Sequence, residues 1–442
     1  MTDTSLSTPD PKRKTSLIAV DARTAKRNAA ERRFKLYGIA AILIGLSFLV
    51  VLGATIIRNG VPAFTRAVMD VEFTLSAEEF ATAEKQLFKT KAYEGIFIAA
   101  LQVQLEERGV TVPFDAAVIE RIVGKTGGTI REYFLANETM VGQPVRFSLA
   151  TSSRVDGYFK GRVTRENVVD SRFLMVSDLD LVDVLRDAGI IKTEFNMPFI
   201  TGADSGVDNP GGAGIGVSVV GSFFMMLVVL FLSLPIGVAA SIYLEEFAPK
   251  NRWTDLIEVN ISNLAAVPSI VFGILGLAVF IQFMHLPQSA PLVGGLVLTL
   301  MTLPTIIIAT RASLRAVPPS IRDAALGVGA SRMQAVFHHV LPLAMPGILT
   351  GTIIGLAQAL GETAPLLLIG MVGFVARGYP ETFLGGFTDP NSAMPAQIYT
   401  WAARADVGFY EKAWGGIIIL LIFLLTMNII AIILRRRFER RW

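Results

Sequence analysis

The sequence predicts a helical membrane protein that crosses the bilayer several times and carries an inserted α+β domain. Of its 442 residues, 52% are hydrophobic and only 17% are charged, whereas soluble proteins carry about 25% charged residues. The mean hydropathy is +0.53. Long uncharged runs alternate with charge-rich stretches, which is typical of a chain with several membrane spans.

Six runs are apolar and long enough to span a bilayer, which takes roughly 20 residues. Because lipid offers no hydrogen-bond partners to the backbone, each run is expected to be a helix. The six predicted spans are Leu36–Ile57, Ile215–Leu244, Val259–Met284, Pro291–Thr310, Leu341–Val375 and Ala413–Leu434.

Basic residues gather at the two ends of the chain and predict its orientation. Residues 1–35 and 435–442 form basic tails, and the positive-inside rule places both in the cytoplasm. The modest net charge of +3 therefore indicates orientation rather than binding to nucleic acid. With six spans, residues 245–258 and 311–340 are cytoplasmic loops, and residues 285–290 and 376–412 are external.

Residues 58–214, between the first and second spans, predict a separate external domain. Periodic apolar positions predict helices within Ala81–Glu107 and Ala116–Ala136, and alternation predicts strands at Val68–Leu75 and Val145–Ala150. The glycine-rich stretch Gly202–Gly216 predicts a linker into the second span, with a ligand-binding loop as the alternative.

Two classes of chemistry are excluded or disfavoured. The chain has no cysteine and only three histidines, so disulfides and thiolate metal sites are excluded and a histidine metal centre is not expected. We predict neither a metal nor a cofactor. The tripeptide Gly124-Lys125-Thr126 is not a phosphate-binding P-loop, because that motif needs glycine where Ile119 stands.

The most informative segment lies at about residues 311–342. Two prolines precede a helical run that Gly329 ends, and Ser331 can cap the helix that follows. This pattern predicts a short helix at the membrane surface that can lie in a groove of a partner protein. An ordinary amphipathic interfacial helix is the alternative.

The spacing in this segment resembles the EAA loop of ABC importer permeases. In that loop a Glu-Ala-Ala triplet is followed by Gly after three residues and by Ile-x-Leu-Pro after nine more. Asp replaces the Glu here, and His339 replaces the Ile. The resemblance implies an ABC importer permease fold and a coupling helix seated on a separate ATPase chain, so that this chain is no enzyme. The residues of the implied coupling loop are Arg322, Asp323, Ala324, Ala325, Gly329, Leu341 and Pro342.

Three further segments, Leu232–Phe247, Asn260–Leu277 and Gly361–Leu368, resemble the phosphate permeases of the PstA type. The resemblance covers about residues 215–434 and is most specific at VPSIVFG and GETAP. It implies a permease subunit of an ATP-driven phosphate importer in a bacterial inner membrane. The implied partners are a homologous second permease, two copies of an ATP-binding subunit and a periplasmic phosphate-binding protein. Residues 58–214 resemble an insertion that some members of the family carry.

Glu362 is the single carboxylate inside a predicted span, and such a group is a candidate functional site. Gly361 and Pro365 flank it, so we expect an interrupted helix whose free N–H groups can face an anion. A carboxylate repels phosphate, so Glu362 is expected to pair with an arginine or to carry a proton. The family usually has arginine where Gln358 stands. The translocation-path candidates are Glu362, Gln358, Arg311 and Thr363, with helix packing as the alternative for Glu362 and membrane anchoring for Arg311.

Gly347, Gly351 and Gly355 recur every four residues. This spacing lets another helix approach closely, in this chain or in the second permease, with a pore-lining role as the alternative. Three other functions remain open: a permease for another oxyanion such as sulfate or molybdate, a membrane sensor, and a transporter that runs without ATP. The absence of a cytoplasmic output domain and of an internal repeat disfavours the last two.

Overall fold

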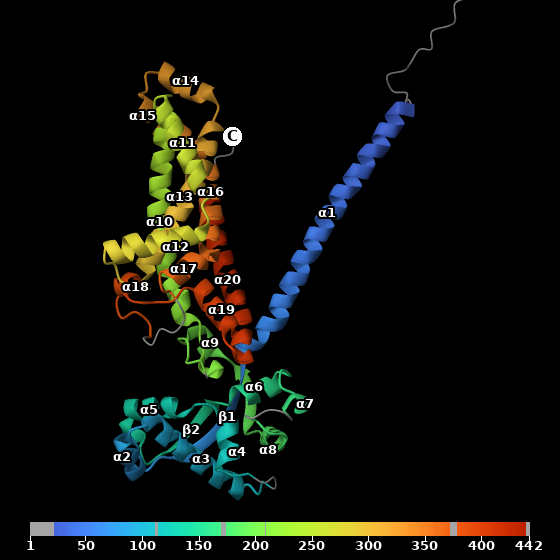
Figure 1. Ribbon diagram of the computed structural model, residues 1–442, viewed down its shortest axis with the longest axis vertical. Helices are drawn as coiled ribbons and strands as arrows, with labels where there is room; N and C mark the ends of the chain where they lie inside the picture. Colours follow the sequence, from blue (N-terminus) through green and yellow to red (C-terminus); the bar gives the residue numbers. More distant parts are fainter. Residues whose placement is uncertain (1–21, 111–113, 169–173, 208, 372–377, 439–442) are drawn as a thin grey trace, which may run out of the picture. The chain divides into compact units, whose positions relative to one another are not determined.

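The computed structural model describes residues 22–110, 114–168, 174–207, 209–371 and 378–438 (Figure 1). Parts of the two predicted basic tails (residues 1–21 and 439–442) and the end of the fifth predicted span lie outside the described residues. The chain divides into two units, residues 1–55 and 56–442, and each is described by itself.

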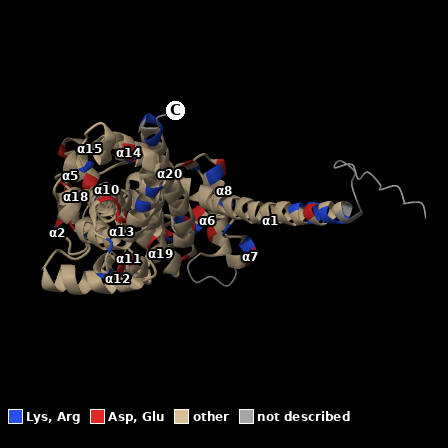
Figure 2. Cartoon of the chain, turned by 90° about the horizontal axis from the view of Figure 1, so that it is seen from above, with Lys and Arg blue, Asp and Glu red and all other residues tan. Residues whose placement is uncertain are grey.

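The first unit is formed by the first helix of the chain. Helix α1 runs from Ala22 to Gly60, so that its last residues belong to the second unit. It contains the predicted span Leu36–Ile57. Basic side chains lie in its first turns and the following stretch carries no charge (Figure 2). At 1.5 Å per residue, the uncharged stretch is long enough to cross a bilayer core of about 30 Å.

A three-stranded antiparallel sheet begins the second unit, with strand order β2-β1-β3. Strand β1 (Thr65–Thr74) pairs with β2 (Pro144–Ala150) and with β3 (Ile191–Phe195). The two predicted strands are confirmed, and β3 was not predicted. On β1 the side chains of Met69, Val71 and Phe73 are buried, while Glu72 and Thr74 are exposed, as expected of a strand with one face on a core.

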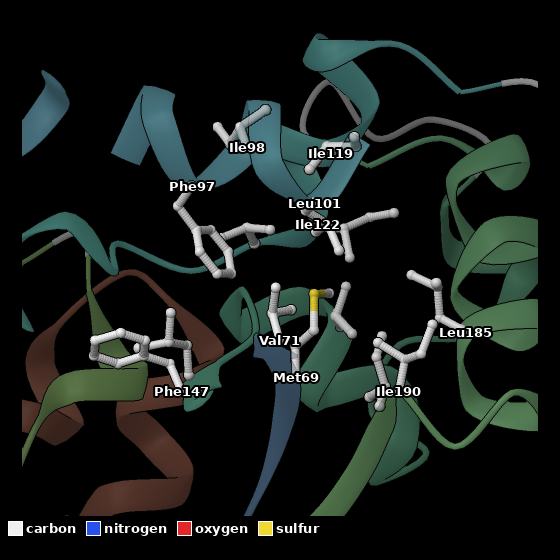
Figure 3. Close-up of a cluster of buried hydrophobic side chains, with 14 of the residues drawn as sticks. Met69, Val71, Phe97, Ile98, Leu101, Ile119, Ile122, Phe147, Leu185 and Ile190 are labelled. Carbon is white, nitrogen blue, oxygen red and sulfur yellow. The ribbon is translucent and has the colours of Figure 1, made fainter. Parts of the chain in front are cut away.

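Helices cover the buried face of this sheet (Figure 3). Phe97 and Leu101 of α3, Ile119 of α4 and Leu185 of α8 pack with Met69 in one hydrophobic core. Burying each of these side chains contributes roughly 1.5–3 kcal/mol. The predicted α+β domain is thus present. Its helices are α2 (Ala77–Lys85), α3 (Lys89–Glu107), α4 (Ala116–Ile122), α5 (Gly127–Ala136), α6 (Ser153–Phe159), α7 (Arg165–Val168) and α8 (Val176–Asp187). The short helix α9 (Met197–Thr201) follows β3, and its Phe199 packs in the core of the bundle.

The remainder of the second unit is a bundle of apolar helices. Helix α13 packs between α10 and α16, and α20 packs against α16 and α19. The helices are α10 (Gly216–Ile242), α11 (Arg252–Leu264), α12 (Ser269–Gly276), α13 (Pro291–Arg315), α14 (Pro319–Gly327), α15 (Arg332–Ala335), α16 (Leu341–Gly361), α17 (Ala364–Leu368), α18 (Gly385–Thr388), α19 (Met394–Ala403) and α20 (Val407–Phe438).

Two of the predicted spans differ from the structure. The third predicted span is not one helix: α11 and the helical stretch Ser269–Phe283 meet at 100°, with Pro268 at the start of α12. Proline lacks the N–H that would continue the ladder. The described residues contain five helices suited to crossing a membrane, or six when this bent pair counts as one.

The fifth predicted span, Leu341–Val375, is too long. Helix α16 ends at Gly361, and Glu362 follows in an extended conformation before the short helix α17. The expected interruption near Glu362 is therefore present. The apolar composition continues beyond it because α17 is buried against α12, and burial demands apolar residues as lipid does.

The inserted domain is joined to the bundle by four ionised side chains, which we call the junction cluster: Asp156, Lys160, Arg162 and Glu411. Lys160 Nζ lies 2.6 Å from Asp156 Oδ2 and 2.7 Å from Glu411 Oε1. Arg162 Nε lies 2.5 Å from Glu411 Oε2. Asp156 also accepts a hydrogen bond from the backbone of Ala67 on β1. The cluster therefore connects the sheet to the beginning of α20.

The predicted linker Gly202–Gly216 does lead into α10, but the bundle holds it in place. Asp204 accepts hydrogen bonds from the Trp401 indole at 2.7 Å and from Arg404 Nη2 at 2.6 Å. The side chain of Asp204 is only 3% exposed. A buried, fully paired carboxylate of this kind restrains a segment that composition alone would describe as flexible.

Candidate functional site

The segment between α13 and α16 folds as its sequence predicts. Helix α14 begins after Pro318, and Gly329 follows its end with φ +89°. Glycine reaches this left-handed region without strain. Ser331 then starts α15 with a capping box: its hydroxyl accepts from Gln334 N at 3.2 Å, and its own N–H donates to Gln334 Oε1 at 2.9 Å. The predicted break at Gly329 and the predicted cap at Ser331 are confirmed.

Helix α14 has one covered face and one open face. Ala325 is buried, and Ile321 packs on a hydrophobic cluster at the ends of α10, α13 and α16. Asp323, Ala324 and Gly329 are exposed. Large apolar side chains on the segment are exposed as well, namely Leu326, Val328, Met333 and Phe337. The open face combines a carboxylate with apolar surface, which is the composition of a protein-docking surface.

Leu341 and Pro342 lie at the start of α16, both half-buried. They follow a π-helical turn at Val336–Val340. The helix continues from Arg332 to Gly361 through this turn, and the wide turn lies where Pro342 removes a backbone N–H. These two residues therefore shape the return of the chain into the bundle and lie apart from the open face of α14.

Six charged side chains tie the same segment to the helix ends around it, and we call them the loop network: Glu245, Glu246, Glu258, Arg311, Arg315 and Arg322. Arg311 Nη2 donates to Glu258 Oε1 at 2.5 Å, and its Nε reaches Glu245 Oε2 at 3.4 Å. Arg315 Nε donates to Glu245 Oε1 at 2.7 Å. The three carboxylates were not predicted as functional residues, although they lie at the edges of apolar runs and equal the arginines in number.

Arg322 belongs to the predicted coupling residues, yet its side chain faces the bundle. It donates to Glu246 from Nε at 3.2 Å and from Nη2 at 2.7 Å. Its Nη1 donates to the Val317 carbonyl at 2.8 Å, and Nη2 also donates to the Leu314 carbonyl at 2.9 Å. Arg322 thus differs in its surroundings from the exposed Asp323 and Ala324 beside it.

The predicted glycine stripe of α16 faces α13 within the chain. A Cβ atom at Gly347 would lie 2.8 Å from Ser313 Cβ, and one at Gly355 would lie 3.3 Å from Thr302 Cγ2. Gly351 contacts Ala309 in the same way. The glycines therefore allow α13 and α16 to run antiparallel in close contact.

The four predicted translocation-path residues do not gather at one place. Glu362 directly follows α16 and is half-buried, with the exposed Gln358 in the last turn of that helix and Thr363 after it. By the register of α13 against α16, Arg311 lies beside about residue 349, so roughly 20 Å of helix separates it from Glu362. Among the residues that the structure describes, Arg311 pairs with Glu245 and Glu258, and no ion pair involves Glu362.

The two segments that carry the most specific resemblance meet in space. Gly273, at the end of VPSIVFG, lies against Pro365 of GETAP: a Cβ atom there would lie 2.7 Å from the Pro365 Cα. Helices α12 and α17 pack together along this contact. Two interrupted helices, about 90 residues apart in sequence, thus form one broken-helix site in which Glu362 stands at the break.

The comparisons with known proteins find two matching families and several related permeases. Residues 233–442 match the family described as "Binding-protein-dependent transport system inner membrane component". Residues 21–168 match a family described as "Domain of unknown function (DUF3333)". A probable ABC transporter permease protein, YqgI of Bacillus subtilis, is 30% identical over 54% of this chain and 83% of its own length.

Relatives named for phosphate transport also match. The phosphate transport system permease protein PstA 1 of Mycobacterium tuberculosis is 31% identical over 48% of this chain and 66% of its own length. The probable phosphate transport system permease protein PstA of Methanocaldococcus jannaschii is 28% identical over 56% of this chain and 83% of its own. An inward-facing structure of the MetNI methionine ABC transporter aligns over 51% of this chain and 95% of its own, with 16% identity and a TM-score of 0.38.

The chain belongs to the family of binding-protein-dependent inner membrane transport components, the permease subunits of ABC importers. It is a multi-pass inner membrane protein and a transport subunit rather than an enzyme. Membership implies a partner permease, a separate ATPase subunit and a binding protein. The predicted fold class, all-α with an inserted α+β domain, is confirmed.

Proposed function

We propose that this chain is the permease subunit of an ATP-driven phosphate importer, in which it forms half of the translocation path. The observation that carries the proposal is the contact of VPSIVFG with GETAP at Gly273 and Pro365. These two segments carry the resemblance to phosphate permeases, and relatives 31% identical are named phosphate transport system permeases. The two segments therefore belong to one packed surface of this chain.

The proposed topology follows from the charges. Helix α20 ends with Arg435, Arg436 and Arg437, at the same end of the second unit as α14 (Figure 1). The positive-inside rule puts this end in the cytoplasm and the inserted domain in the periplasm. Both termini are then cytoplasmic. Two ATPase copies bind the loop of this chain and of its partner permease, and a periplasmic phosphate-binding protein delivers the cargo.

For the path itself, the proposal assigns Glu362, Gln358 and Thr363 to the broken-helix site. A carboxylate there repels phosphate, so its negative charge is balanced by a proton or by a basic side chain of the second permease. Weak contacts suit a path that must release its cargo. Arg311 lies outside this part of the proposal because the loop network already uses its charge.

The cargo is tested by uptake of radiolabelled phosphate at low concentration in cells that lack this chain, with sulfate uptake as the control. We expect phosphate uptake to be lost, sulfate uptake to be unchanged, and the wild-type chain to restore phosphate uptake. Loss of sulfate uptake with normal phosphate uptake would contradict the proposed cargo and leave the family assignment intact.

The coupling role of the loop is tested at Gly329. Its φ of +89° strains a β-branched side chain by roughly 1–2 kcal/mol, whereas asparagine tolerates the region. We expect Gly329→Ile to lower phosphate uptake at least tenfold with normal membrane abundance, and Gly329→Asn to retain most of it. Normal uptake in Gly329→Ile would remove the loop from the mechanism.

A further inference from the structure

Arg322 is placed differently from its neighbours on the predicted docking surface. Its side chain is 23% exposed and that of Glu246 is 10% exposed, while Asp323 and Ala324 are exposed to solvent. All three guanidinium nitrogens are engaged within the chain, on Glu246 and on the carbonyls of Leu314 and Val317. Few of its donors remain for a partner protein.

These contacts join three elements at one point. Glu246 lies in the π-helical turn Tyr243–Phe247 that ends α10, and the two carbonyls lie at the end of α13. The last carbonyls of a helix lack intrahelical partners and carry partial negative charge, so a guanidinium stabilises them. The planar guanidinium of Arg322 donates to a carboxylate and two carbonyls at the same time. A lysine ammonium cannot reproduce this geometry.

Ion pairs of Glu245, the residue next to Glu246, extend these contacts to further helices of the bundle. Glu245 accepts hydrogen bonds from Arg315 and Arg311, both on α13, and Arg311 also donates to Glu258 of α11. A displacement of α14 therefore acts on the ends of α10 and α13 and, through Arg311, on the bent pair that begins with α11. Helix α11 has no buried residue of its own, so this ion pair is one of its principal attachments.

We propose that Arg322 and Glu246 form a latch that positions α14 on α10 and α13 and transmits movement of the loop to the membrane helices. Arg322 is then a positioning residue, and the docking contacts belong to the exposed side chains of the segment. The inference rests on the proposed function only in taking the loop to be the point where the ATPase acts.

The latch is tested with Glu246→Gln, which removes the negative charge, and with Arg322→Lys, which keeps the positive charge but removes the planar guanidinium. Asp180→Asn and Arg165→Lys are the matched controls, because this pair is exposed on the inserted domain. In the assembled transporter in proteoliposomes, we expect both latch variants to co-purify with the ATPase subunit and to hydrolyse ATP within about twofold of wild type. Phosphate transported per ATP is expected to fall at least tenfold, with the controls unchanged.

A second measurement does not depend on the cargo. The chain has no cysteine, so spin labels at Val328→Cys and Lys250→Cys report the distance between the end of α14 and the connection from α10 to α11 in the full-length chain. We expect one narrow distance distribution with an intact latch and a broad one in either latch variant. The narrow distribution persisting in both variants, or loss of the ATPase subunit from Arg322→Lys, would overturn the latch. If the wild-type chain transports no phosphate but the distances still differ between wild type and the latch variants, only the proposed cargo is wrong.

Discussion

The junction cluster and the loop network are both built from arginine, lysine and carboxylates, but their burial differs. In the junction cluster, the side chains of Lys160 and Glu411 are 7% and 4% exposed. In the loop network, exposure extends from 10% at Glu246 to 60% at Arg315. Charges removed from water are costly unless every partner is present, while exposed pairs contribute little. The junction cluster therefore holds the inserted domain on the bundle in one position, whereas the loop network allows movement.

The packing around each cluster shows the same contrast. Near Glu411, Gly415 lies directly against Ala63 and Phe199, and Lys412 lies 4.7 Å above the Phe199 ring. Around the loop network, α11 has no buried residue and α14 has an open face. Close packing transmits strain and resists rearrangement. The junction cluster thus lies beside a closely packed part of the bundle, whereas the loop end of the bundle is suited to repositioning.

The largest effect is expected from breaking the junction cluster. Glu411→Ala removes the carboxylate nearest to Arg162 and leaves the buried Lys160 with Asp156 alone. Breaking a buried ion pair by removing one partner costs about 3–5 kcal/mol. Thermal unfolding of the purified chain in detergent is expected to begin at a clearly lower temperature, with faster hydrogen exchange in the inserted domain. A loss below about 1 kcal/mol would show that the cluster is not a structural clamp.

A smaller effect is expected from overfilling the packing beside it. In Gly415→Val the new Cβ would lie 2.5 Å from Ala63 Cβ, so the backbone must shift at a cost of about 1–3 kcal/mol. Gly416→Ala is a milder change for comparison, because its Cβ would meet Ile398 Cγ1 at 2.9 Å and Ile215 Cδ1 at 3.1 Å, and isoleucine side chains can rotate away. Equal stability of Gly415→Val and wild type would mean that this end of α20 is mobile.

Glu84 belongs to neither cluster, and its protonation predicts a pH-dependent change in stability with which the cluster variants can be compared. Hydrogen bonds from Arg131, then from Lys89, lower the pKa of Glu84 from 4.5 to about 2. The folded domain therefore binds a proton at Glu84 less readily than the unfolded chain does. The stabilisation that this carboxylate gives to the fold is present above about pH 4.5 and is lost as the pH falls toward 2. The protection factors of the amides in α2 and α3, which correct for the intrinsic pH dependence of exchange, are expected to fall between about pH 4.5 and pH 2, and Glu84→Gln should remove part of that dependence.

The smallest effect is expected in the exposed part of the loop network. Arg315→Ala removes a pair whose arginine is 60% exposed, so the stability loss is expected below about 1 kcal/mol. Chemical or thermal unfolding beside Glu411→Ala measures the difference directly. Comparable losses in the two variants would abolish the contrast between a fixed junction and a movable loop end.

Local sequence signals predicted local structure well. Strands β1 and β2 were predicted because alternation is visible within each. Strand β3 was missed because IKTEF has little apolar pattern, and pairing with Thr65–Met69 of β1 decides it. The third span was predicted as one apolar run that Pro268 kinks or ends, and the structure places a 100° bend at this proline.

The sequence by itself determined that the chain is a membrane protein, where its helices break and which residues cap them. These properties depend on composition and on neighbours within a few positions. Only the tertiary structure decided that Arg322 faces Glu246, that Arg311 lies far from Glu362, and that the glycine stripe meets α13. Which charges and surfaces meet depends on how helices distant in sequence pack, and no local pattern specifies that packing.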